Sequence, residues 1–495
     1  MRVSFLIDST DFRRWQAEAI ADVLAATGAS GAIVTVAGPQ PAGLLDLCLA
    51  FETLSFRGPR SGPLDRLSPT GLNLPVGPAD ADLVIDLAAS TETTGDRLLV
   101  TVGGFGVVAG AADAIMAGKE PFLDLIAVVD GQQRLVGRWH VAVEDWRQLG
   151  SGMTIAAGRA IEMLTLATSR LAAGATLRSL KLPCVNVEPP QHRPGQPAMF
   201  AATAFARSLA ARLERLVRTP PNWAVAWRTD ETGDGALPTI TGHPWRRLAD
   251  DGGRFYADPF AVRYDGRTIL FVEEFPFATQ KGLISAVELG TNGPIGTPRP
   301  VIETDCHLSY PFIFEEDGAL YMIPESSGRR KVELWRSINF PDLWEKVAIL
   351  IDDIDLGDAT LLRADGRYYL FGAVRPHWGS SWDGLAIFTA DRLTDRWAPL
   401  FAGPAKVDVS SARPAGRMFS LGTSVVRPFQ DSVGGYGAGL GFARVDQLDA
   451  GGYAETTLMA LRPALPLSGL HTYNRGGGFE VIDVIADGEA VVVTP

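Results

Sequence analysis

Phe255-Tyr-Ala-Asp258-Pro-Phe260 opens a pattern that the second half of the chain repeats. Seven residues after Asp258 comes an Asp–Gly pair. The same step of seven leads from Tyr310 (Tyr-Pro-Phe) to a second pair, and from Asp358 (Asp-Ala-Thr) to a third. The pairs begin at residues 265, 317 and 365, so they are 52 and 48 residues apart. Self-similarity at this period indicates a repeat architecture such as a propeller or a solenoid.

Each repeat has the same order of elements: a first strand, the Asp–Gly turn, a second strand and a third strand. Asp–Gly between alternating apolar runs is a strong hairpin signal. The first three repeats predict strands at 258–264, 268–275 and 282–289, at 310–316, 319–326 and 331–337, and at 358–364, 368–374 and 384–390. A fourth, weaker strand carries Trp344 in one repeat and Trp397 in another.

Two looser repeats follow. Their strands are predicted at 413–419, 424–429 and 439–445, and at 471–473, 479–485 and, after a turn at 487–488, 490–493. The last repeat is cut short, and a propeller completes such a blade with a strand from the other end of the domain. Because 223–228 is apolar, extended and otherwise unpaired, we assign it to that closure. Residues 222–495 are therefore predicted to form a five-bladed β-propeller of four-stranded antiparallel blades; a β-sandwich does not explain the period.

The first part of the chain alternates short apolar strands with helices. Strands are predicted at 2–7, 32–36, 81–87 and 98–102, a hairpin at 125–129 and 135–143, and helices at 11–26 and 153–173. This alternation favours a parallel sheet, so residues 1–180 are predicted as a Rossmann-like α/β domain. Gly103-Gly-Phe-Gly106 lacks the Gly-x-Gly-x-x-Gly spacing of a dinucleotide site, and predicts a turn with positive φ.

Residues 181–221 are predicted as a linker followed by a helix. The segment 185–199 is rich in Pro and Gln. The segment 200–218 has a helical period, with Phe and Leu on one side and mostly Arg on the other. We interpret the arginines as a solvated or interdomain face, and a membrane-lying basic helix is the alternative.

Composition excludes several classes of protein. A net charge of −12 without a long basic run argues against a nucleic-acid partner. Three cysteines without a CxxC pair, and six histidines without paired spacing, predict neither a metal site nor a disulfide framework; no cofactor motif appears. The first apolar run is too short for a signal peptide and is interrupted by Asp8. No window of about 18 apolar residues predicts a membrane span. A cytoplasmic setting is expected, and the oligomeric state stays open.

Carboxylates recur at equivalent positions of the repeats. Asp258 and Asp358 share one first-strand position with Tyr310, and Glu274 aligns with Glu325 on the second strand. The innermost strands of a propeller line a central channel, where apolar neighbours are expected to raise the pKa of an acid. Paired carboxylates are the minimum for glycoside cleavage. The alternative is that these acids cap turns by accepting hydrogen bonds from backbone amides.

A second group of candidate residues is basic and aromatic. Its members are His307, Arg375, His377, Trp378, Trp382, Arg413, Arg417, Arg427 and His471. The loop Arg375-Pro-His-Trp378-Gly-Ser-Ser-Trp382-Asp suits stacking on a sugar ring. The three arginines of the fourth repeat predict either a bound anionic group or neutralisation of the acids. With Glu274 and Tyr310, these residues are our candidates for substrate binding.

Several motifs together resemble a known family. They are Phe255-Tyr-Ala-Asp258-Pro-Phe, Phe271-Val-Glu-Glu274-Phe-Pro-Phe, His307-Leu-Ser-Tyr310-Pro-Phe, Tyr321-Met-Ile-Pro-Glu325-Ser, Asp358-Ala-Thr-Leu-Leu and Arg413-Pro-Ala-Gly-Arg417. They resemble the propeller domain named after the N-terminal part of plant glucosamine inositolphosphorylceramide transferases. In bacteria that domain follows a formyltransferase-like α/β domain, an order that this chain resembles too.

More distantly, Tyr-Ala-Asp258-Pro-Phe is similar to the first-blade motif of the five-bladed glycoside hydrolases of families 43 and 32. That resemblance implies Asp258 as base or nucleophile, Glu325 as general acid and Asp358 as a stabilising residue. The chain departs from the pattern in two places. Blade two begins with Tyr310 where those hydrolases have Asp, and Glu325 lies on a second strand.

Three functions follow as expectations. The first is glycoside hydrolysis or glycosyl transfer through Asp258 and Glu325, with Asp358 assisting, on a sugar or glycoconjugate. The second is a non-catalytic glycan-binding or assembly module in envelope polysaccharide synthesis. The third, implied by the formyltransferase resemblance, is formyl transfer to an amino sugar. That family uses Asn, His and Asp, whereas residues 1–180 hold one Asn, Asn73, and one His, His140, outside an Asn-x-His pattern. We therefore expect a degenerate domain.

Overall fold

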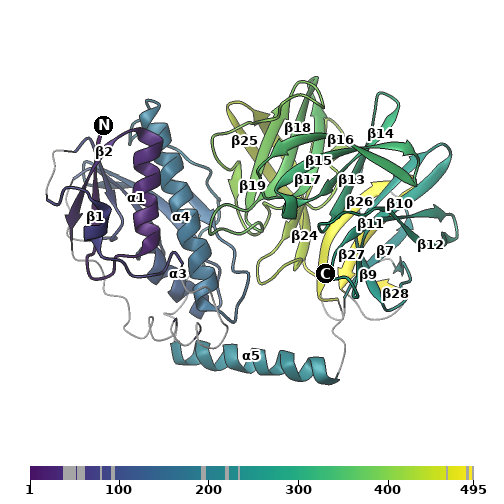
Figure 1. The fold of residues 1–495 in the computed structure, drawn as a ribbon, viewed down its shortest axis with the longest axis horizontal. Helices are drawn as coiled ribbons and strands as arrows, with labels where there is room; N and C mark the ends of the chain where they lie inside the picture. The colour runs from purple at the N-terminus through teal and green to yellow at the C-terminus, as the bar shows by residue number, and fades with distance from the viewer. Residues whose placement is uncertain are drawn as a thin grey trace. The chain divides into compact units, whose positions relative to one another are not determined.

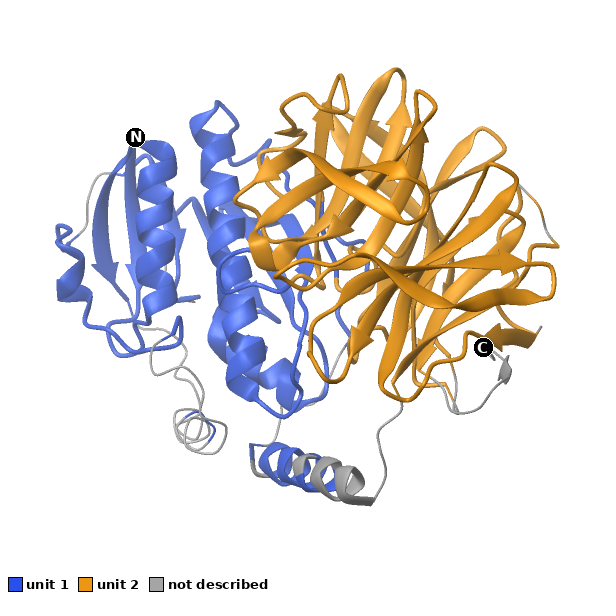
Figure 2. Ribbon diagram, turned by 45° about the vertical axis from the view of Figure 1, so that its right-hand side comes forward, with its two compact units in different colours: residues 1–219, 376–380, 406–408 blue, residues 220–375, 381–405, 409–495 orange. Residues whose placement is uncertain are grey.

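The chain forms two compact units in the computed structural model (Figures 1 and 2). Unit 1 comprises residues 1–219, 376–380 and 406–408, and unit 2 comprises 220–375, 381–405 and 409–495. The described residues are 1–36, 49, 52, 62–77, 81–90, 95–190, 197–217, 222–231, 233, 235–242, 244–463, 467–485 and 490–492. The predicted turn at 487–488 lies outside them. No helix among the described residues is long and apolar enough to cross a membrane.

Unit 1 is built on a six-stranded sheet of order β2-β1-β3-β4-β5-β6. Its strands are β1 (Arg2–Ile7), β2 (Ser30–Thr35), β3 (Leu83–Asp86), β4 (Arg97–Val102), β5 (Phe122–Val129) and β6 (Gln132–His140). The first four pair in parallel, and β5 and β6 form an antiparallel hairpin continued from β4. The fully buried pattern of β4 is what a central strand covered on both faces requires.

Unit 1 also contains four helices among its described residues. They are α1 (Arg14–Thr27), α3 (Val107–Met116), α4 (Leu149–Ala172) and α5 (Pro197–Val217), with a 3₁₀ turn η1 (Pro69–Leu72). Of these helices, α3 and α4 pack against the sheet. The long helix α4 contacts both α1 and α3 (Figure 1). Between strand β4 and helix α3, Gly103 and Gly104 adopt φ of 60° and 83°, as the predicted positive-φ turn requires.

Unit 2 consists of five sheets, so the predicted five-bladed β-propeller is confirmed. The strands of blade one are β9 (Arg254–Tyr264), β10 (Arg267–Pro276), β11 (Leu283–Gly290) and β12 (Gly293–Ile302). Those of blade two are β13 (Ser309–Glu316), β14 (Ala319–Glu325), β15 (Lys331–Asn339) and β16 (Leu343–Asp352). Those of blade three are β17 (Leu356–Ala364), β18 (Arg367–Val374), β19 (Gly384–Ala390) and β20 (Ala398–Pro399), while the short β21 (Lys406–Val407) belongs to unit 1. A 3₁₀ turn η2 (Ser327–Arg329) precedes β15.

Blade four is formed by β22 (Phe419–Leu421), β23 (Ser424–Asp431), β24 (Gly439–Asp449) and β25 (Gly452–Leu461). Its predicted first strand, 413–419, is wrong for most of its length. Only Pro414 makes an isolated bridge, to Phe429, before β22 begins. The prediction of four strands in every blade is also wrong, because blade five has five.

Blade five joins the two ends of unit 2. It has the order β26-β27-β7-β8-β28, from β26 (Gly469–Gly476), β27 (Phe479–Ile485), β7 (Trp223–Thr229), β8 (Pro244–Arg247) and β28 (Ala490–Val492). All seven residues of β7 pair with β27. The ring is thus closed by strands from both ends of the unit.

The hairpins of the first three blades turn as their sequence predicts. Asp265, Asp317 and Asp365 have φ of 49°, 50° and 51°, and the glycines that follow have φ of 74°, 73° and 75°. Two successive positive φ values define the type I′ turn, whose twist matches that of the strands it joins. Because the three turns have the same geometry, the residue seven positions before each turn occupies the same place on the first strand of its blade.

Candidate functional site

The first strands of the blades lie innermost, because β9 contacts β13 and β26, and β13 contacts β17. Each of these four strands carries a bulge in which two residues oppose one on the second strand. The first residue of the bulge is Asp258, Tyr310, Asp358 or His471. In the first three it has φ of 49°, 42° and 53°. The positions that the repeat makes equivalent are thus equivalent in backbone geometry.

Carboxylates of one blade hold the bulge of the next. The amide of Tyr310 donates to Asp258 Oδ2 at 3.1 Å, and the amide of Asp358 donates to Glu325 Oε2 at 3.0 Å. The amide of Asp258 donates to Asp483 Oδ2 at 2.9 Å, across the closure from blade five. A bulge leaves backbone amides outside the ladder, and these bonds satisfy them. The predicted capping role of the acids is therefore part of their function.

The predicted alignment of Glu274 with Glu325 is wrong by one residue. In the ladders Glu273 pairs with Ala257 and Glu325 pairs with Ser309, which places Glu273 at the position of Glu325. Adjacent residues of a strand point to opposite faces, so Glu274 has a different environment. Its carboxylate pairs with Arg254 and accepts a hydrogen bond from Ser285, 2.6 Å away.

The side chain of Glu273 approaches His307 instead. His307 Nε2 lies 3.3 Å from Glu273 Oε1, while His307 Nδ1 accepts a hydrogen bond from the amide of Gly282 at 3.0 Å. An accepting Nδ1 fixes the neutral tautomer with the proton on Nε2, directed at the carboxylate. Although burial acts in the opposite direction, the hydrogen bond to Glu273 raises the pKa of His307.

Asp358 is the centre of a polar network from blades three and four. Its Oδ2 accepts hydrogen bonds from Arg413 Nε at 2.5 Å and from Gln430 Nε2 at 2.8 Å. Burial of this carboxyl raises its pKa to about 6, against the effect of the Arg413 guanidinium and with a further upward contribution from Glu325. Charges of Asp358 and Glu325 therefore lie close enough to interact.

His471 lies between two carboxylates. Its Nδ1 is 2.7 Å from Asp483 Oδ1, and its Nε2 is 3.4 Å from Asp258 Oδ1. Burial disfavours the imidazolium, but Asp483 and Asp258 prevail and raise the pKa of His471 to about 9. Burial raises the pKa of Asp258 well above its ordinary value, with His471 acting against it and Glu273 adding to it.

Among the described residues, Asp258, His471 and Asp483 form a group whose ligand atoms lie within 4.8 Å of one another, as a metal site requires. Their contacts fit a different purpose. Asp483 Oδ1 accepts from the imidazole and from the amide of Thr472 at 2.8 Å, and Asp258 Oδ1 accepts from the Thr472 hydroxyl at 3.0 Å. Both imidazole nitrogens face carboxylates, which suits a protonated histidine rather than a cation ligand.

An aromatic cluster of Trp223, Trp382 and Tyr436 adjoins these polar groups. The Tyr436 ring is 5.6 Å from Trp382, 6.2 Å from Trp223 and 5.2 Å from the His471 imidazole. The Arg413 guanidinium lies 5.1 Å above the same ring. Trp223, Trp382 and Tyr436 all keep exposed surface. Part-exposed aromatic rings beside hydrogen-bonding groups are the combination that binds the apolar face and hydroxyls of a sugar.

Other predicted binding residues are used in packing. Arg427 is fully buried, and its guanidinium donates to both oxygens of Glu455 and to the Ser411 carbonyl. Tyr310 is fully buried as well, with its hydroxyl 2.8 Å from Thr360 Oγ1. Trp378 belongs to unit 1, where its indole donates to Glu18 at 2.9 Å. Arg427 and Tyr310 therefore support the fold of unit 2, and Trp378 packs within unit 1.

The remaining predicted residues have mixed environments. Arg417 donates to the carbonyl of Ile313 and lies over Phe312, and burial lowers its pKa to about 10. Arg375 lies 3.9 Å from Asp355 and donates to Ser381, which also accepts from Arg413 at 3.3 Å. Arg375 is thus one hydroxyl away from the Asp358 network.

Sequence reasoning missed Asp483, Gln430, Tyr436 and Glu273, and it gave Trp223 only a structural role. One of these had a visible signal: Glu273 and Glu325 both follow the glycine of their turn by seven residues. Asp483 stands inside an apolar strand, and Tyr436 lies in a glycine-rich loop, so neither belongs to a repeat position.

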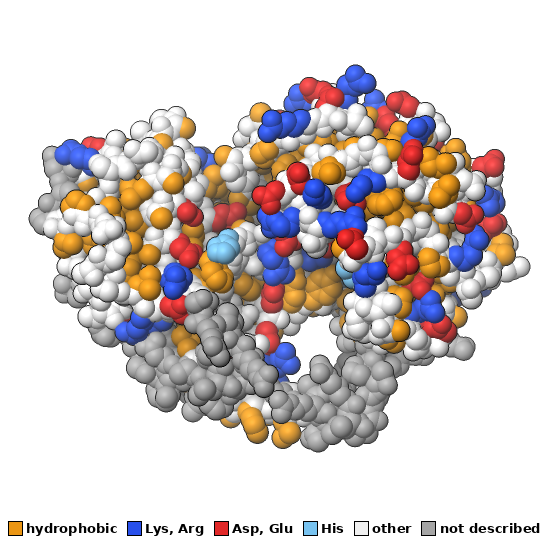
Figure 3. Space-filling view, viewed as in Figure 1, with side chains coloured by type: hydrophobic (Ala, Val, Ile, Leu, Met, Phe, Trp, Pro, Cys, Tyr) orange, Lys and Arg blue, Asp and Glu red, His pale blue; other side chains and the backbone are white. Residues whose placement is uncertain are grey.

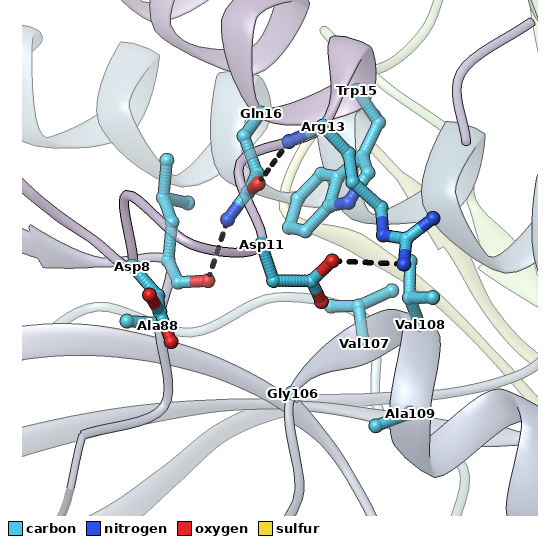
Figure 4. A pocket seen from close by; sticks show the side chains of 11 residues that line it. Asp8, Asp11, Arg13, Trp15, Gln16, Ala88, Gly106, Val107, Val108 and Ala109 are labelled. Carbon is cyan, nitrogen blue, oxygen red and sulfur yellow. Dashed lines mark hydrogen bonds and ion pairs between the residues drawn. The ribbon is translucent and has the colours of Figure 1, made fainter. Parts of the chain in front are cut away.

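Unit 1 has a pocket where β1 and β3 end and α3 begins (Figure 4). Arg13 pairs with Asp11 at 2.8 Å, and Gln16 donates to the Leu87 carbonyl at 3.0 Å. Asp8 lies on the same pocket wall. Carboxylates beside a helix N-terminus already supply the negative charge that its dipole favours.

The surface visible in Figure 3 intermixes basic and acidic side chains over unit 2.

Residues 236–474 match the protein family described as glucosamine inositolphosphorylceramide transferase 1, N-terminal. The chain is 30% identical over 205 residues to glucosamine inositolphosphorylceramide transferase 1 of Arabidopsis thaliana, which covers 41% of this chain and 27% of that protein. It is 30% identical over 224 residues to the protein of the same name from Oryza sativa subsp. japonica, covering 44% and 29%. The chain thus matches less than a third of the length of these curated relatives.

Two solved structures of glycoside hydrolases show a low similarity to this chain. A glycosyl hydrolase from Bacteroides ovatus is 12% identical, with a TM-score of 0.39, over 56% of this chain and 94% of that one. The catalytic domain of a family 62 α-L-arabinofuranosidase from Coprinopsis cinerea is also 12% identical, with a TM-score of 0.34, over 47% and 74%. Structures this different indicate nothing about the function of the chain. The family match shows that residues 236–474, in unit 2, are similar to the N-terminal family of the glucosamine inositolphosphorylceramide transferases.

Proposed function

We propose that unit 2 is a carbohydrate-active module that binds a sugar or glycoconjugate beside Asp258, Asp358 and Glu325. One observation carries the proposal. The carboxyl groups of Asp258, Glu325 and Asp358 come from three successive blades, and Asp358 interacts electrostatically with the other two. The part-exposed rings of Trp382 and Tyr436 lie 5.6 Å apart in the same unit. Acids and aromatic rings at one site are what sugar recognition needs, and paired acids are what glycosyl chemistry needs.

The reaction class is glycoside hydrolysis or glycosyl transfer. One carboxyl donates a proton to the leaving oxygen as the bond from the anomeric carbon breaks. A second carboxylate removes the proton of the attacking hydroxyl, from water or from an acceptor sugar, as the new bond forms. Asp358, held by Arg413, assists by orienting the sugar. This balance needs no cofactor.

The geometry favours roles opposite to those that the hydrolase resemblance implies. Burial raises the pKa of Asp258, which favours the protonated form that a general acid needs. Glu325, which accepts hydrogen bonds from the Ser327 hydroxyl at 2.9 Å and from the Asp358 amide, is then left as the partner that takes up the proton of the attacking hydroxyl. We therefore assign the donor to Asp258 and the base to Glu325.

A second candidate is a non-catalytic glycan-binding or assembly module, as in envelope polysaccharide synthesis. It is favoured by the ion pairing of the acids, since Asp358 with Arg413 and Asp258 with His471 are engaged without any substrate. The relatives' name contains a glucosamine and an inositolphosphorylceramide, so an amino sugar or a phosphoinositol glycolipid is the substrate class we would test first. Only their N-terminal family is matched, and their transferase activity is not carried over to this chain.

For unit 1 we retain the Rossmann-like, formyltransferase-like assignment as a proposal, together with a cytoplasmic setting. A formyl-transfer function has little support from the contacts of His140. This imidazole stacks on Phe122 at 4.1 Å, and its Nδ1 lies 3.2 Å from Asp408. Those contacts use the ring for packing. Assay of formyl transfer to an amino-sugar nucleotide by the full chain tests this alternative.

The test of the main proposal is turnover of aryl glycosides and nucleotide sugars by the full chain, Asp258→Asn and Glu325→Gln, with Glu274→Gln as the control. In Asp258→Asn, turnover of glycosides with poor leaving groups should fall by about 100-fold. Turnover of dinitrophenyl glycosides should be unchanged, since dinitrophenolate leaves without being protonated. Loss of the base should harm both kinds equally. Binding without turnover in every protein would favour the glycan-binding module.

A further inference from the structure

The buried histidine between two carboxylates has no part in the proton transfers described above. His471 occupies the bulge position of blade five, and it is 3% exposed. Asp258, Tyr310 and Asp358 occupy that position in blades one to three. Blade five thus carries a basic side chain at the position where blades one and three carry acids and blade two carries Tyr310.

Contacts from several elements fix the imidazole. Asp483 on β27 accepts from Nδ1, and Asp258 on β9 faces Nε2. Trp223 on β7 lies 4.1 Å from the ring at a tilt of 39°, and Tyr436 meets it edge-on at 5.2 Å. Asp358 on β17 adds a more distant negative charge. Burial lowers the pKa of His471, and the charges of Asp483, Asp258 and Asp358 raise it. The Arg413 guanidinium lies beyond, against Tyr436 and Asp358.

Asp483 has the arrangement of an orienting residue. It is fully buried, and its two oxygens accept from the His471 imidazole, from two backbone amides of the bulge and from the Asp258 amide. The same carboxylate thus sets the ring orientation of His471 and the backbone position of Asp258. A change at Asp483 must affect both.

We propose that His471, oriented by Asp483, is a positioning residue that holds the Asp258 carboxyl and balances the negative charge that this carboxyl gains when it gives up its proton. The proposal rests on the assignment of Asp258 as the proton donor. A charge relay through three groups is not required. The imidazolium stays protonated throughout, and its Nε2–H donates toward the oxygen of Asp258 that also accepts from Thr472. The proton that leaves Asp258 goes to the departing oxygen of the sugar.

The first arm of the test does not depend on turnover. The full chain labelled with ¹⁵N-histidine is titrated by NMR, and the His471 signal is assigned by its loss in His471→Gln. We expect imidazolium shifts at pH 7 and a transition near pH 9. In Asp483→Asn the transition should fall by at least about one pH unit, because a facing charge is lost. A neutral His471 at pH 7 in the native chain would overturn the proposal.

The second arm uses the pH profile of kcat/KM on a substrate with a poor leaving group. Without the facing cation, the limb that reports Asp258 should move upward by about one pH unit in His471→Gln, with little change in KM. Unchanged limbs with an altered KM would mean a merely structural role and would overturn the proposal. If no substrate is turned over, the proposed chemistry fails, while the NMR arm still decides the ion pair.

A metal control completes the design. Calcium or zinc added to the labelled chain should leave the His471 signals in place, because the imidazole nitrogens face the two carboxylates as donors. Displacement of these signals at stoichiometric metal would identify a cation site and overturn the positioning role.

Discussion

Replacement of Arg413 by Met tests the electrostatics of the site in a single substitution. Arg413 Nε lies 2.5 Å from Asp358 Oδ2, and the two side chains are 10% and 3% exposed. Methionine keeps much of the apolar length of the side chain but removes the charge and the donors. Asp358 would then be a buried carboxylate whose remaining side-chain donor is Gln430.

The magnitude of the effect depends on pH. Removing one member of a buried ion pair costs about 3–5 kcal/mol, because an uncompensated charge is left in the interior. The pKa of Asp358 is about 6 in the folded protein, above its ordinary 3.8, so folding takes up a proton between these values. A pKa difference of one unit corresponds to 1.36 kcal/mol. The titration of Asp358 alone therefore lowers the free energy of unfolding by about 3 kcal/mol as the pH rises from 4 to 7.

In the variant the folded pKa of Asp358 is higher still, so the loss continues to higher pH. We expect Arg413→Met to lower the free energy of unfolding by about 3–5 kcal/mol at pH 8. At pH 5 Asp358 is already protonated in both proteins. There we expect the substitution to lower the free energy of unfolding by roughly 1 kcal/mol, because other hydrogen bonds of Arg413 are lost.

Urea unfolding of the full chain, followed by tryptophan fluorescence at both pH values, measures this difference. Arg444→Met is the matched control, since Arg444 Nε lies 2.6 Å from Asp446 but the side chains are 44% and 31% exposed. Its loss should stay below about 1 kcal/mol at either pH. An equal loss at pH 5 and pH 8, or a loss no greater than that of the control, would refute the reasoning.

Further predictions concern the corrected register and the close packing of the ring. In Glu273→Gln the pKa of His307 should fall toward its ordinary value, as measured by NMR, whereas Glu274→Gln should leave it unchanged; the reverse result would contradict the register. Gly416→Ala should lower the free energy of unfolding by at least about 2 kcal/mol, since its φ is 135° and an added Cβ would lie 2.0 Å from a backbone oxygen of blade five. Gly328→Ala, with open space around it, is the control, and thermal unfolding that shifts equally in both would disprove the packing argument.

Local turn chemistry made the propeller predictable. Asp265–Gly266 and its two counterparts can adopt the paired positive φ of a type I′ turn, and few other dipeptides can. Because the turn fixes the register, a count of seven residues in either direction reaches the bulge and the second-strand acid. The closing strand was also predictable, since β7 is apolar and extended where no partner precedes it in sequence.

The face of a side chain was harder to predict. The choice between Glu273 and Glu274 depends on a bulge in the opposite strand, and an error of one residue moves a side chain to the other face. Asp483 looked like an interruption of an apolar strand, because its partners, His471 and Asp258, come from two different blades. Tyr436 lies in a loop without repeat equivalents, so only the folded ring places it beside Trp382.

The acids of this site serve two purposes at once. Asp258 and Glu325 hold bulge amides of the next blade, which is a structural role, and they are also the groups we propose for chemistry. Variants that remove their charge but keep their acceptor oxygens, such as Asn and Gln, therefore separate the two purposes better than alanine does.

The central claim is that unit 2 recognises a sugar at the aromatic cluster of Trp223, Trp382 and Tyr436. The most direct measurement is binding of the full chain to a glycan panel that includes amino sugars and phosphoinositol glycans, followed by calorimetry on the best ligand. We predict that Trp382→Ala weakens that ligand by about tenfold, or 1.4 kcal/mol, whereas Leu343→Ala, on the exposed strand β16, leaves it unchanged. Binding that both variants retain equally, or no binding to any glycan, would contradict the account.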